Sequence, residues 1–436
     1  MSSAPVTLDK ITALCKRRGF VFQAAEIYSG LNGVYDFGPL GVQLKQNIKA
    51  AWLKNMTSWP EEVLLLDGSI LGPESVWQAS GHLENFSDPM VDCLNCKKRF
   101  RSDEEGFDIA RPCPSCGVKN WTDVRQFQLM FETNLGAVAA SKAYLRPETA
   151  QAIFINFKNV FTSNRVKIPF GIAQIGKAFR NEITPKQFLF RMREFEQMEI
   201  EFFCKGEQAD AFFETWLERR KAFYEQIGLN KDKIRLRPHA ADELSHYSKC
   251  CTDVEYNFPF GWKELEGIAN RTDFDLSRHS QFSGKELAVF DEETKTSYVP
   301  HVVECSVGVD RLFLTLLFDA YHEDEVDGEV RTVLRFHPAV APVTAAILPL
   351  TNKLKEQTSK IYLDLKKNGY RVQLDESGSI GKRYRRQDEI GTPVCFTFDF
   401  DSLEDGKVTA RDRDTLQQER IAIDKLQEYL DQKLKG

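Results

Sequence analysis

Two strand candidates joined by a short polar loop decide the fold. Residues 170–203 read FGIAQIGKAFRNEITPKQFLFRMREFEQMEIEFF. Phe170–Ile183 and Phe190–Phe203 are extended segments, and residues 184–187 (TPKQ) are typical of a turn. The pattern predicts a long antiparallel pair.

Charged residues lie within the returning strand of this pair. Alternate strand residues share a face, so we expect Arg191, Arg193 and Phe195 on one face, followed by Gln197 and Glu199. Charges among apolar neighbours are costly unless they are solvated or bound to a ligand. The face could bind a triphosphate, a base and an ammonium in sequence, because arginine forks fit phosphate oxygens. A solvated face with cross-strand ion pairs is the equal alternative.

A second charged segment, residues 304–311 (ECSVGVDR), joins a strand candidate, 300–308, to a helix candidate, 309–320. Gly308 permits a close approach of a ligand. Arg311 lies in the first turn of the helix, where the helix dipole disfavours a cation, and this favours an incoming anion. The alternative is a surface arginine paired near Asp310.

The surrounding elements continue outward from these segments. Leu40, Leu44, Ile48, Ala51 and Trp52 recur at helical spacing and predict a helix over 40–56. Strand candidates cover 63–66 and 70–71, and a helix covers 209–227, whereas 228–300 are mixed and carry no assignment. After a boundary at 336–342, strands at 345–350, 370–374, 394–400 and 407–411 alternate with helices at 351–368, 379–388 and 414–434. This alternation predicts a layered sheet.

Composition narrows the class of protein. The chain has 436 residues, 42% of them hydrophobic and 28% charged, which excludes collagen-like, fibrous and mostly disordered chains. Its 58 basic and 64 acidic residues give a net charge of −6, so any nucleic-acid binding needs local patches. Residues 1–10 carry no signal pattern, and no apolar run approaches the roughly 18 residues of a membrane span. We expect a cytoplasmic protein.

Four cysteines form two CxxC pairs. Cys93 and Cys96 are separated by 16 residues from Cys113 and Cys116, a spacing typical of structural zinc. Four unliganded cysteines are the alternative. The other cysteines show no metal spacing, and we expect most of them to be small buried hydrophobes; they are Cys15, Cys204, Cys250, Cys251, Cys305 and Cys395.

A basic run in the C-terminal part is a candidate tRNA contact. Lys382, Arg383, Arg385 and Arg386 lie within five residues, together with Tyr384. Phosphate contacts supply affinity for nucleic acids, and aromatic rings stack on unpaired bases. A solvated helix face is the alternative.

Taken together, these motifs resemble those of the class II aminoacyl-tRNA synthetases, and most closely the dimeric glycyl-tRNA synthetase family. Residues 179–182 (FRNE) with the strand to Phe195 resemble the second class II motif, 308–311 (GVDR) the third, and 40–73 the first. Further similar segments are 17–20 (RRGF), 35–41 (YDFGPLG), 80–82 (SGH), 145–151 (LRPETAQ), 193–199 (REFEQME), 246–248 (HYS) and 272–275 (TDFD). The similarity runs from about residue 8 to the end.

The resemblance implies an α+β catalytic domain with an antiparallel sheet over 1–338, a zinc-ribbon insertion at 87–125 and an insertion at 205–300. An α/β anticodon-binding domain follows over 339–436. The implied reaction joins glycine to tRNA with ATP and Mg²⁺, and the implied assembly is a homodimer. Departures are modest: Cys305 stands where the family commonly has proline.

The resemblance also implies residue roles. Arg180, Glu182 and Arg311 would be catalytic. The implied ATP site comprises Arg180, Asn181, Glu182, Phe190, Arg191, Met192, Arg193, Glu194, Phe195, Glu264, Leu265, Gly308, Val309, Asp310 and Arg311. The implied glycine site comprises Arg101, Glu148, Phe195, Glu196, Gln197, Met198, Glu199, Glu304, Cys305, Ser306, Val307 and Gly308.

Two other functions remain open at this point. One is a synthetase-derived accessory protein without catalysis, which would lose the motif arginines and acids. The other is a class II synthetase for threonine, proline or histidine. The retained charged residues and the long glycyl-type motifs disfavour both.

Overall fold

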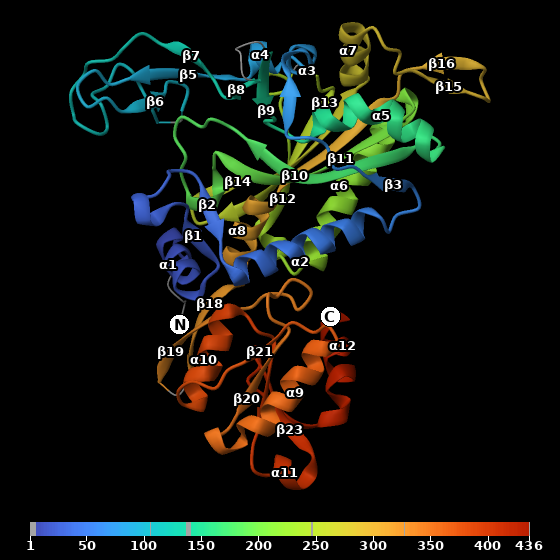
Figure 1. The fold of residues 1–436 in the computed structure, drawn as a ribbon. Coiled ribbons are helices and arrows are strands. Elements are labelled where there is room, and N and C mark those ends of the chain that lie inside the picture. The colour runs from blue at the N-terminus through green and yellow to red at the C-terminus, as the bar shows by residue number, and fades with distance from the viewer. Residues whose placement is uncertain (1–5, 105, 137–140, 246, 327, 436) are drawn as a thin grey trace.

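A large mixed sheet organises the N-terminal two thirds of the chain in the computed structural model, which describes residues 6–104, 106–136, 141–245, 247–326 and 328–435. Its seven strands, in spatial order, are β12 (Ile234–Pro238), β13 (Cys250–Phe258), β14 (Gly261–Thr272), β17 (His301–Gly308), β11 (Glu194–Cys204), β10 (Phe170–Phe179) and β3 (Glu62–Leu65). All neighbours are antiparallel except β3 and β10. A smaller α/β body lies below it (Figure 1).

The predicted antiparallel pair is present, but its return strand begins later than expected. β10 and β11 pair from Phe170 with Phe203 to Phe179 with Glu194. Arg191 and Arg193 therefore precede the strand, which corrects the expectation that they share its face with Phe195. Positive φ angles at Gln187 and Phe188 turn the loop. The Arg193 guanidinium bonds the carbonyl oxygens of Asn32, at 2.8 Å, and Glu182, at 2.9 Å.

Three helices cover one face of the sheet. They are α2 (Pro39–Met56), α6 (Ala209–Gln226) and α8 (Val309–Ala320), as the helical spacing predicts. Trp52, Trp216 and Phe313 of these helices pack with Ile200 and Val303 of the sheet in one buried core. The opposite face is covered only at one end, by α5 (Ala150–Asn164) and α7 (Phe274–Ser283). The uncovered end leaves room for a site.

The unassigned residues 228–300 complete the main sheet instead of forming a separate body. They supply β12, β13 and β14, then α7 and the hairpin of β15 (Val289–Asp291) and β16 (Thr296–Tyr298). The polar loops between these strands obscured the strand pattern in the sequence.

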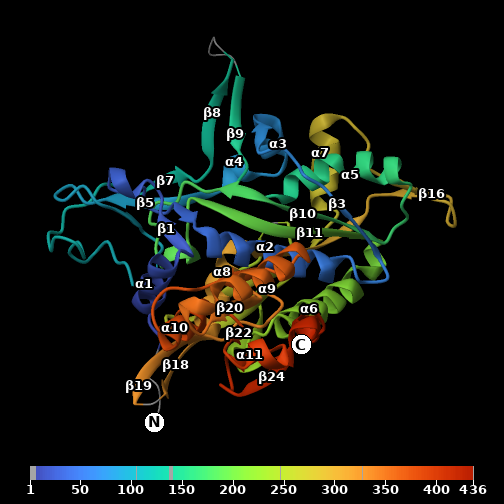
Figure 2. The ribbon, with the colours of Figure 1, turned by 60° about the horizontal axis from the view of Figure 1, so that its bottom comes forward.

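Smaller elements flank the sheet. N-terminal to it lie α1 (Leu8–Arg18), β1 (Val21–Gln23), the 3-10 helix Glu26–Tyr28 and β2 (Tyr35–Phe37). The cysteine module is built on a sheet of three strands, β5 (Ser87–Asp92), β6 (Arg99–Arg101) and β7 (Arg125–Gln128). Next to it lies a second sheet of β4 (Leu71–Pro73), β8 (Phe131–Leu135) and β9 (Ser141–Leu145). The short helices α3 (Glu74–Ala79) and α4 (His82–Asn85) lie in the same region. The β8–β9 hairpin projects away from the sheet (Figure 2).

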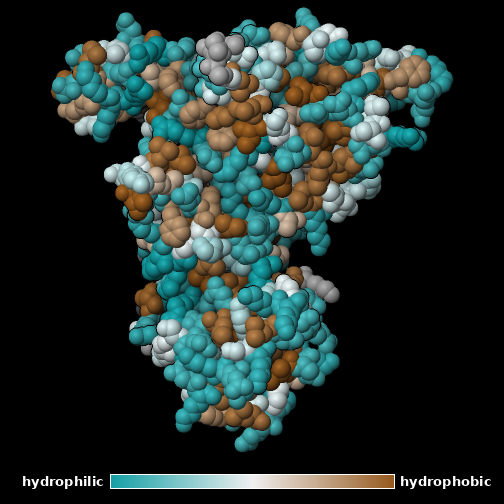
Figure 3. All heavy atoms as spheres, in the orientation of Figure 1, coloured by the Kyte–Doolittle hydropathy of each residue, from teal (hydrophilic) through white to brown (hydrophobic). Residues whose placement is uncertain are grey.

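The C-terminal body follows the hairpin of β18 (Tyr321–Val326) and β19 (Glu329–Leu334). Its sheet has the order β21 (Val372–Leu374), β20 (Ala345–Pro349), β22 (Val394–Phe398), β23 (Lys407–Asp412), β24 (Gln418–Ala422). Helices α9 (Lys355–Lys367), α10 (Ile380–Ile390), α11 (Ser402–Asp405) and α12 (Leu426–Lys435) accompany it. Hydrophilic residues dominate its face in Figure 3.

One predicted C-terminal helix is wrong in its first half. Residues 414–434 were expected to be helical, but Gln418–Ala422 form an edge strand that pairs with β23. The Asp412 carboxylate accepts the backbone N–H groups of Asp414 and Thr415 and closes the hairpin turn. None of the described helices combines the length and apolar character needed to cross a membrane.

Candidate active site

Two adjoining cavities open on the uncovered face of the main sheet. The larger has a volume of about 460 Å³ and the smaller about 260 Å³. Arg180, Gln197, Glu264 and Ser306 line both cavities. Two ligands bound in the two cavities would therefore meet at these four side chains.

Cations and an aromatic ring shape the smaller cavity. Arg180 follows β10, and its guanidinium lies 5.3 Å from the ring centroids of both Phe195 and Phe86. Arg311, at the start of α8, lies 4.5 Å from the Phe190 ring and 3.2 Å from a carboxylate oxygen of Glu264. This ion pair lowers the pKa of Glu264.

Glu182 is one of the acids that line the smaller cavity, and Arg191 lines the same cavity. Burial raises the pKa of Glu182, although Arg191 and Arg180 oppose the shift. The cavity thus combines three arginines with aromatic rings, which suits a nucleotide with several phosphates.

Asp310 supports this wall. One of its oxygens accepts the Lys45 ammonium at 2.7 Å, and the other accepts the backbone N–H of Glu196 at 2.7 Å. The Glu196 carboxylate turns away from the cavities to Lys45 and Lys49 of α2. α2 therefore fixes the start of α8 relative to β11.

Four acids gather in and behind the larger cavity: Glu148, Glu199, Glu201 and Glu304. Glu199 is fully bonded, because it accepts Thr149 N at 2.9 Å, Gln197 Nε2 at 2.9 Å and Ser306 Oγ at 2.6 Å, as well as the Thr149 hydroxyl. Burial and the nearby Glu148 charge raise the pKa of Glu199.

Glu148 and Glu304 are bound more lightly. His82 lies 3.3 Å from Glu148, and Gln151 donates to it at 3.0 Å. Burial raises the pKa of Glu148, but His82, Arg271 and Gln151 together lower it by more, so the net shift is downward. Arg271 Nη1 donates to Glu304 at 3.0 Å. Burial raises the pKa of Glu304 to about 7, against the charge of Arg271 and with help from Glu199 and Glu148.

Several residues of this network were not assigned from the sequence. Arg271 is buried, pairs with Asp275 at 2.8 Å and stands 3.9 Å from the Tyr247 ring. Glu201 faces Glu304 across β11 and β17, and neither of its oxygens has a hydrogen-bond partner among the described residues. The one available signal is the alternation of Glu199 with Glu201 along β11. His246, part of one resembling segment, lies outside the described residues.

The structure separates the expected site residues into two groups. Those that line a cavity are Glu148, Arg180, Glu182, Phe190, Arg191, Met192, Phe195, Gln197, Glu199, Glu264, Glu304, Ser306, Gly308, Asp310 and Arg311. Those that line neither are Arg101, Asn181, Arg193, Glu194, Glu196, Leu265, Met198, Cys305, Val307 and Val309.

The second group has physical reasons to lie elsewhere. Leu265, Met198, Cys305 and Val307 point into the core, because alternate strand residues face the covered side. Val309, the first residue of α8, packs in the same core. Glu194 pairs with Lys177 on the surface, and Asn181 N donates to Leu129 O. Arg101 pairs with Asp88 and Asp103 within the cysteine module, each at 2.9 Å.

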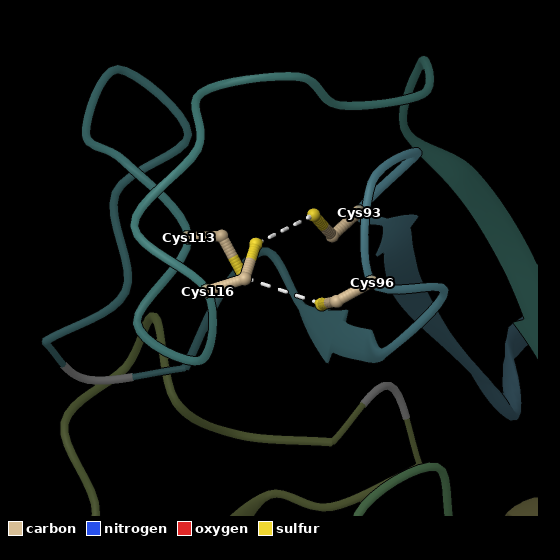
Figure 4. Close-up of side chains that lie close together, drawn as sticks. All are labelled: Cys93, Cys96, Cys113 and Cys116. Atoms are coloured by element: carbon tan, nitrogen blue, oxygen red, sulfur yellow. Dashed lines mark hydrogen bonds between the residues drawn. The ribbon is translucent and has the colours of Figure 1, made fainter.

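The four cysteines converge as the spacing predicts (Figure 4). Cys93 Sγ lies 3.6 Å from Cys116 Sγ, and Cys96 Sγ lies 3.8 Å from Cys113 Sγ. Sulfurs around tetrahedral zinc are roughly 3.8 Å apart, since Zn–S bonds are about 2.3 Å long. The Val118 N–H lowers the pKa of the Cys116 thiol to about 6, which favours the thiolate that zinc binds. The arrangement fits structural zinc.

The basic run lies on α10, but its members differ in exposure. Arg383 is buried, and its guanidinium donates to Pro349 O and, at 2.8 Å, to Gly378 O. This corrects its expected role as a tRNA contact. Arg386 pairs with Asp375 at 2.6 Å, and Arg385 donates to Val326 O at 3.4 Å. Lys382 is exposed.

Comparisons with known proteins agree with this geometry. Residues 137–321 match the family described as "tRNA synthetase class II core domain (G, H, P, S and T)", and residues 344–433 match "Anticodon binding domain". The chain is 53% identical to a glycine--tRNA ligase of Caldanaerobacter subterraneus subsp. tengcongensis, with 99% of both chains covered. Glycine--tRNA ligases of Geobacillus kaustophilus and Clostridium acetobutylicum are 51% and 50% identical, each covering 98% of this chain and 99% of their own.

Proposed function

Because this chain belongs to the glycine--tRNA ligase family of class II synthetases, we propose that its two cavities bind ATP and glycine side by side and form glycyl-adenylate. The observation that carries the proposal is the shared wall of Arg180, Gln197, Glu264 and Ser306 between an arginine-lined cavity and an acid-lined one.

The first step joins glycine to AMP. A glycine carboxylate oxygen attacks the α-phosphorus of ATP, a P–O bond forms, and the bond to the bridging oxygen breaks so that diphosphate leaves with the electron pair. Arg180, which lines both cavities, is placed to neutralise the charge that develops at the α-phosphate. Phe195 offers a face for the adenine, and Arg311 reaches toward the terminal phosphates. Positioning and charge neutralisation suffice for this reaction.

The second step transfers glycine to tRNA. A terminal ribose hydroxyl attacks the adenylate carbonyl carbon, the C–O bond to phosphate breaks, AMP leaves with the electron pair, and the hydroxyl proton passes to solvent or to phosphate. The larger cavity extends beyond what glycine fills and is placed to admit the terminal nucleotide.

Selection of glycine rests on its ammonium group. Glu304 and Glu148 keep oxygen lone pairs free, whereas Glu199 is saturated by its donors. We infer that Glu304 and Glu148 hold the ammonium and that Glu199 holds Thr149, Gln197 and Ser306 in place. Excluding side chains is then a matter of space, which one methyl group tests most severely.

The proposal includes two metal ions, one at the reaction site and one with a structural role. Glu264 is the carboxylate common to both cavities, and carboxylate oxygens suit Mg²⁺, which supplies charge neutralisation to the phosphates when bound. Cys93, Cys96, Cys113 and Cys116 would hold one structural zinc. Metal analysis of the purified protein tests the second part.

The remaining proposals concern partners and organisation. We propose that residues 339–436 bind the anticodon arm, with Lys382 and Arg385 as candidate contacts, and that the catalytic part covers 1–338. We also propose a homodimer in the cytoplasm; sedimentation equilibrium tests the dimer, and a monomer at working concentration contradicts it.

One experiment tests the activity. ATP–diphosphate exchange is measured with glycine, alanine, threonine, proline and histidine in turn, followed by charging of glycine tRNA. Exchange with glycine alone supports the proposal. Exchange with another amino acid contradicts the proposal and indicates a synthetase of different specificity, and no exchange with any of them indicates a protein without catalysis.

A further inference from the structure

A second group of metal-ligand side chains lies on the wall of the larger cavity. His239 follows β12, and Cys251 and Asp253 lie on β13, with their ligand atoms all within 4.8 Å of one another. All three line the cavity. We propose that His239, Cys251 and Asp253 form a site for a thiophilic divalent cation of the zinc group, with the fourth coordination position open to the cavity. This goes beyond the proposed ligase activity and does not depend on it.

The backbone arranges the three ligands. Cys251 and Asp253 are alternate residues of β13 and share its cavity-facing side. The His239 N–H donates to Cys251 O at 2.9 Å, which fixes the histidine beside the strand. The cysteine spacing in the sequence did not reveal this group, because its ligands come from two strands and include one thiol.

The distances suit a tetrahedral ion after small rotations. His239 Nε2 lies 2.9 Å from Asp253 Oδ2 and 4.0 Å from Cys251 Sγ. Metal–ligand bonds of about 2.0–2.3 Å place such atoms roughly 3.4–3.6 Å apart, so each of these two pairs adjusts by about 0.5 Å. Three protein ligands and one open position are typical of exchangeable or catalytic zinc, in contrast to the closed four-cysteine cluster.

The acidic residues of the cavity favour a bound cation, but an arginine side chain competes with it for the same ligands. Glu264 and Glu304 line the same cavity. Arg237 Nη2 lies 2.8 Å from Asp253 Oδ2 and 3.4 Å from His239 Nε2, so an incoming ion must displace it. Arg237 also pairs with Glu255 and Glu243, each at 3.0 Å, and would keep these partners. The ion is therefore exchangeable.

The thiol sets the class of ion. Mg²⁺ prefers oxygen ligands, whereas a thiolate and an imidazole select zinc, cobalt or cadmium. Burial raises the pKa of the Cys251 thiol to about 12, so binding releases its proton. Because the three ligands line the cavity proposed for glycine and the tRNA end, we expect an ion at this wall to inhibit the ligase reaction.

Cobalt(II) provides the test. It is added to full-length protein whose four-cysteine cluster is already loaded with zinc, and the near-ultraviolet sulfur-to-cobalt absorption band is followed. We expect one further cobalt per chain with this band in the wild type and in Cys250→Ala, and its loss in Cys251→Ala. Cys250 is the matched control, since it neighbours Cys251 but does not line the cavity.

Inhibition by cadmium gives a second readout. Each protein is compared with its own metal-free rate of ATP–diphosphate exchange, and the half-inhibiting cadmium concentration is expected to rise at least tenfold in Cys251→Ala but not in Cys250→Ala. The proposal is overturned if the zinc-loaded wild type shows no cobalt band or if Cys251→Ala keeps it. The cobalt arm needs no activity, so failure of the ligase proposal would be seen separately.

Discussion

Glycine binding should weaken about tenfold when the pH is lowered from 8 to 6. Burial raises the pKa of Glu304 to about 7, and the carboxyl is then largely protonated at pH 6. The glycine ammonium needs the ionised carboxylate, so binding must remove this proton. A lower pH therefore weakens glycine binding.

The magnitude follows from that pKa. If only ionised Glu304 binds, the dissociation constant is multiplied by about 1.1 at pH 8, about 2 at pH 7 and about 11 at pH 6. The tenfold change corresponds to about 1.4 kcal/mol. Below pH 7, the logarithm of the dissociation constant should rise by about one for each pH unit lost.

Calorimetry of glycine binding without ATP is the suitable assay, because the phosphates of ATP then do not titrate in the same range. Glu304→Gln is the matched variant: it should bind glycine more weakly at pH 8 and show no slope between pH 6 and 8. A constant dissociation constant for the wild type over this range, or an equal slope in Glu304→Gln, would refute the reasoning.

Three further outcomes are expected. Arg180→Gln should lower the turnover of glycine-dependent exchange about 10²–10³-fold, as for the loss of one transition-state donor, with an unchanged circular dichroism spectrum, and a loss below tenfold contradicts its role. Arg383→Ala should lower the melting temperature by several degrees, because Arg383 is buried and its guanidinium bonds two backbone carbonyls. Lys382→Ala should raise only the KM for tRNA, and equal melting temperatures of the two variants contradict this difference. Cys113→Ser should reduce bound zinc below one per chain and open residues 87–125 to limited proteolysis, and full zinc retention contradicts the four-cysteine site.

Local sequence patterns predicted the elements in which apolar residues or cysteines recur at a regular spacing. The helix over 309–320 agrees with α8 residue for residue, since its apolar residues recur at helical spacing and a glycine precedes it. The helix over 40–56 differs from α2 by one residue. The CxxC pairs predicted a converging cluster because each pair fixes two thiols by local geometry alone.

Contacts between residues far apart in the chain determine the features that local sequence patterns could not predict. The alternation pattern predicts Arg193 on a strand face, but the carbonyl of Asn32, far away in the chain, holds its side chain in a loop. Arg383 resembled a surface cation, yet Pro349 O lies where its guanidinium can reach. The edge strand β24 depends on its partner β23, and its own residues read equally well as part of a helix.

The acids of the larger cavity differ in their partners, and these differences decide which of them can hold an ammonium group. The oxygens of Glu199 accept hydrogen bonds from neutral donors, and Glu148 lies 3.3 Å from His82. Glu304 has one charged partner, Arg271, which is itself held by Asp275. Glu201 faces Glu304 across the strands, and burial, followed by the Glu304 charge, raises its pKa well above the ordinary value. Among these acids, Glu304 is therefore the one whose pKa, raised by burial to about 7, lets an arriving ammonium complete its ionisation.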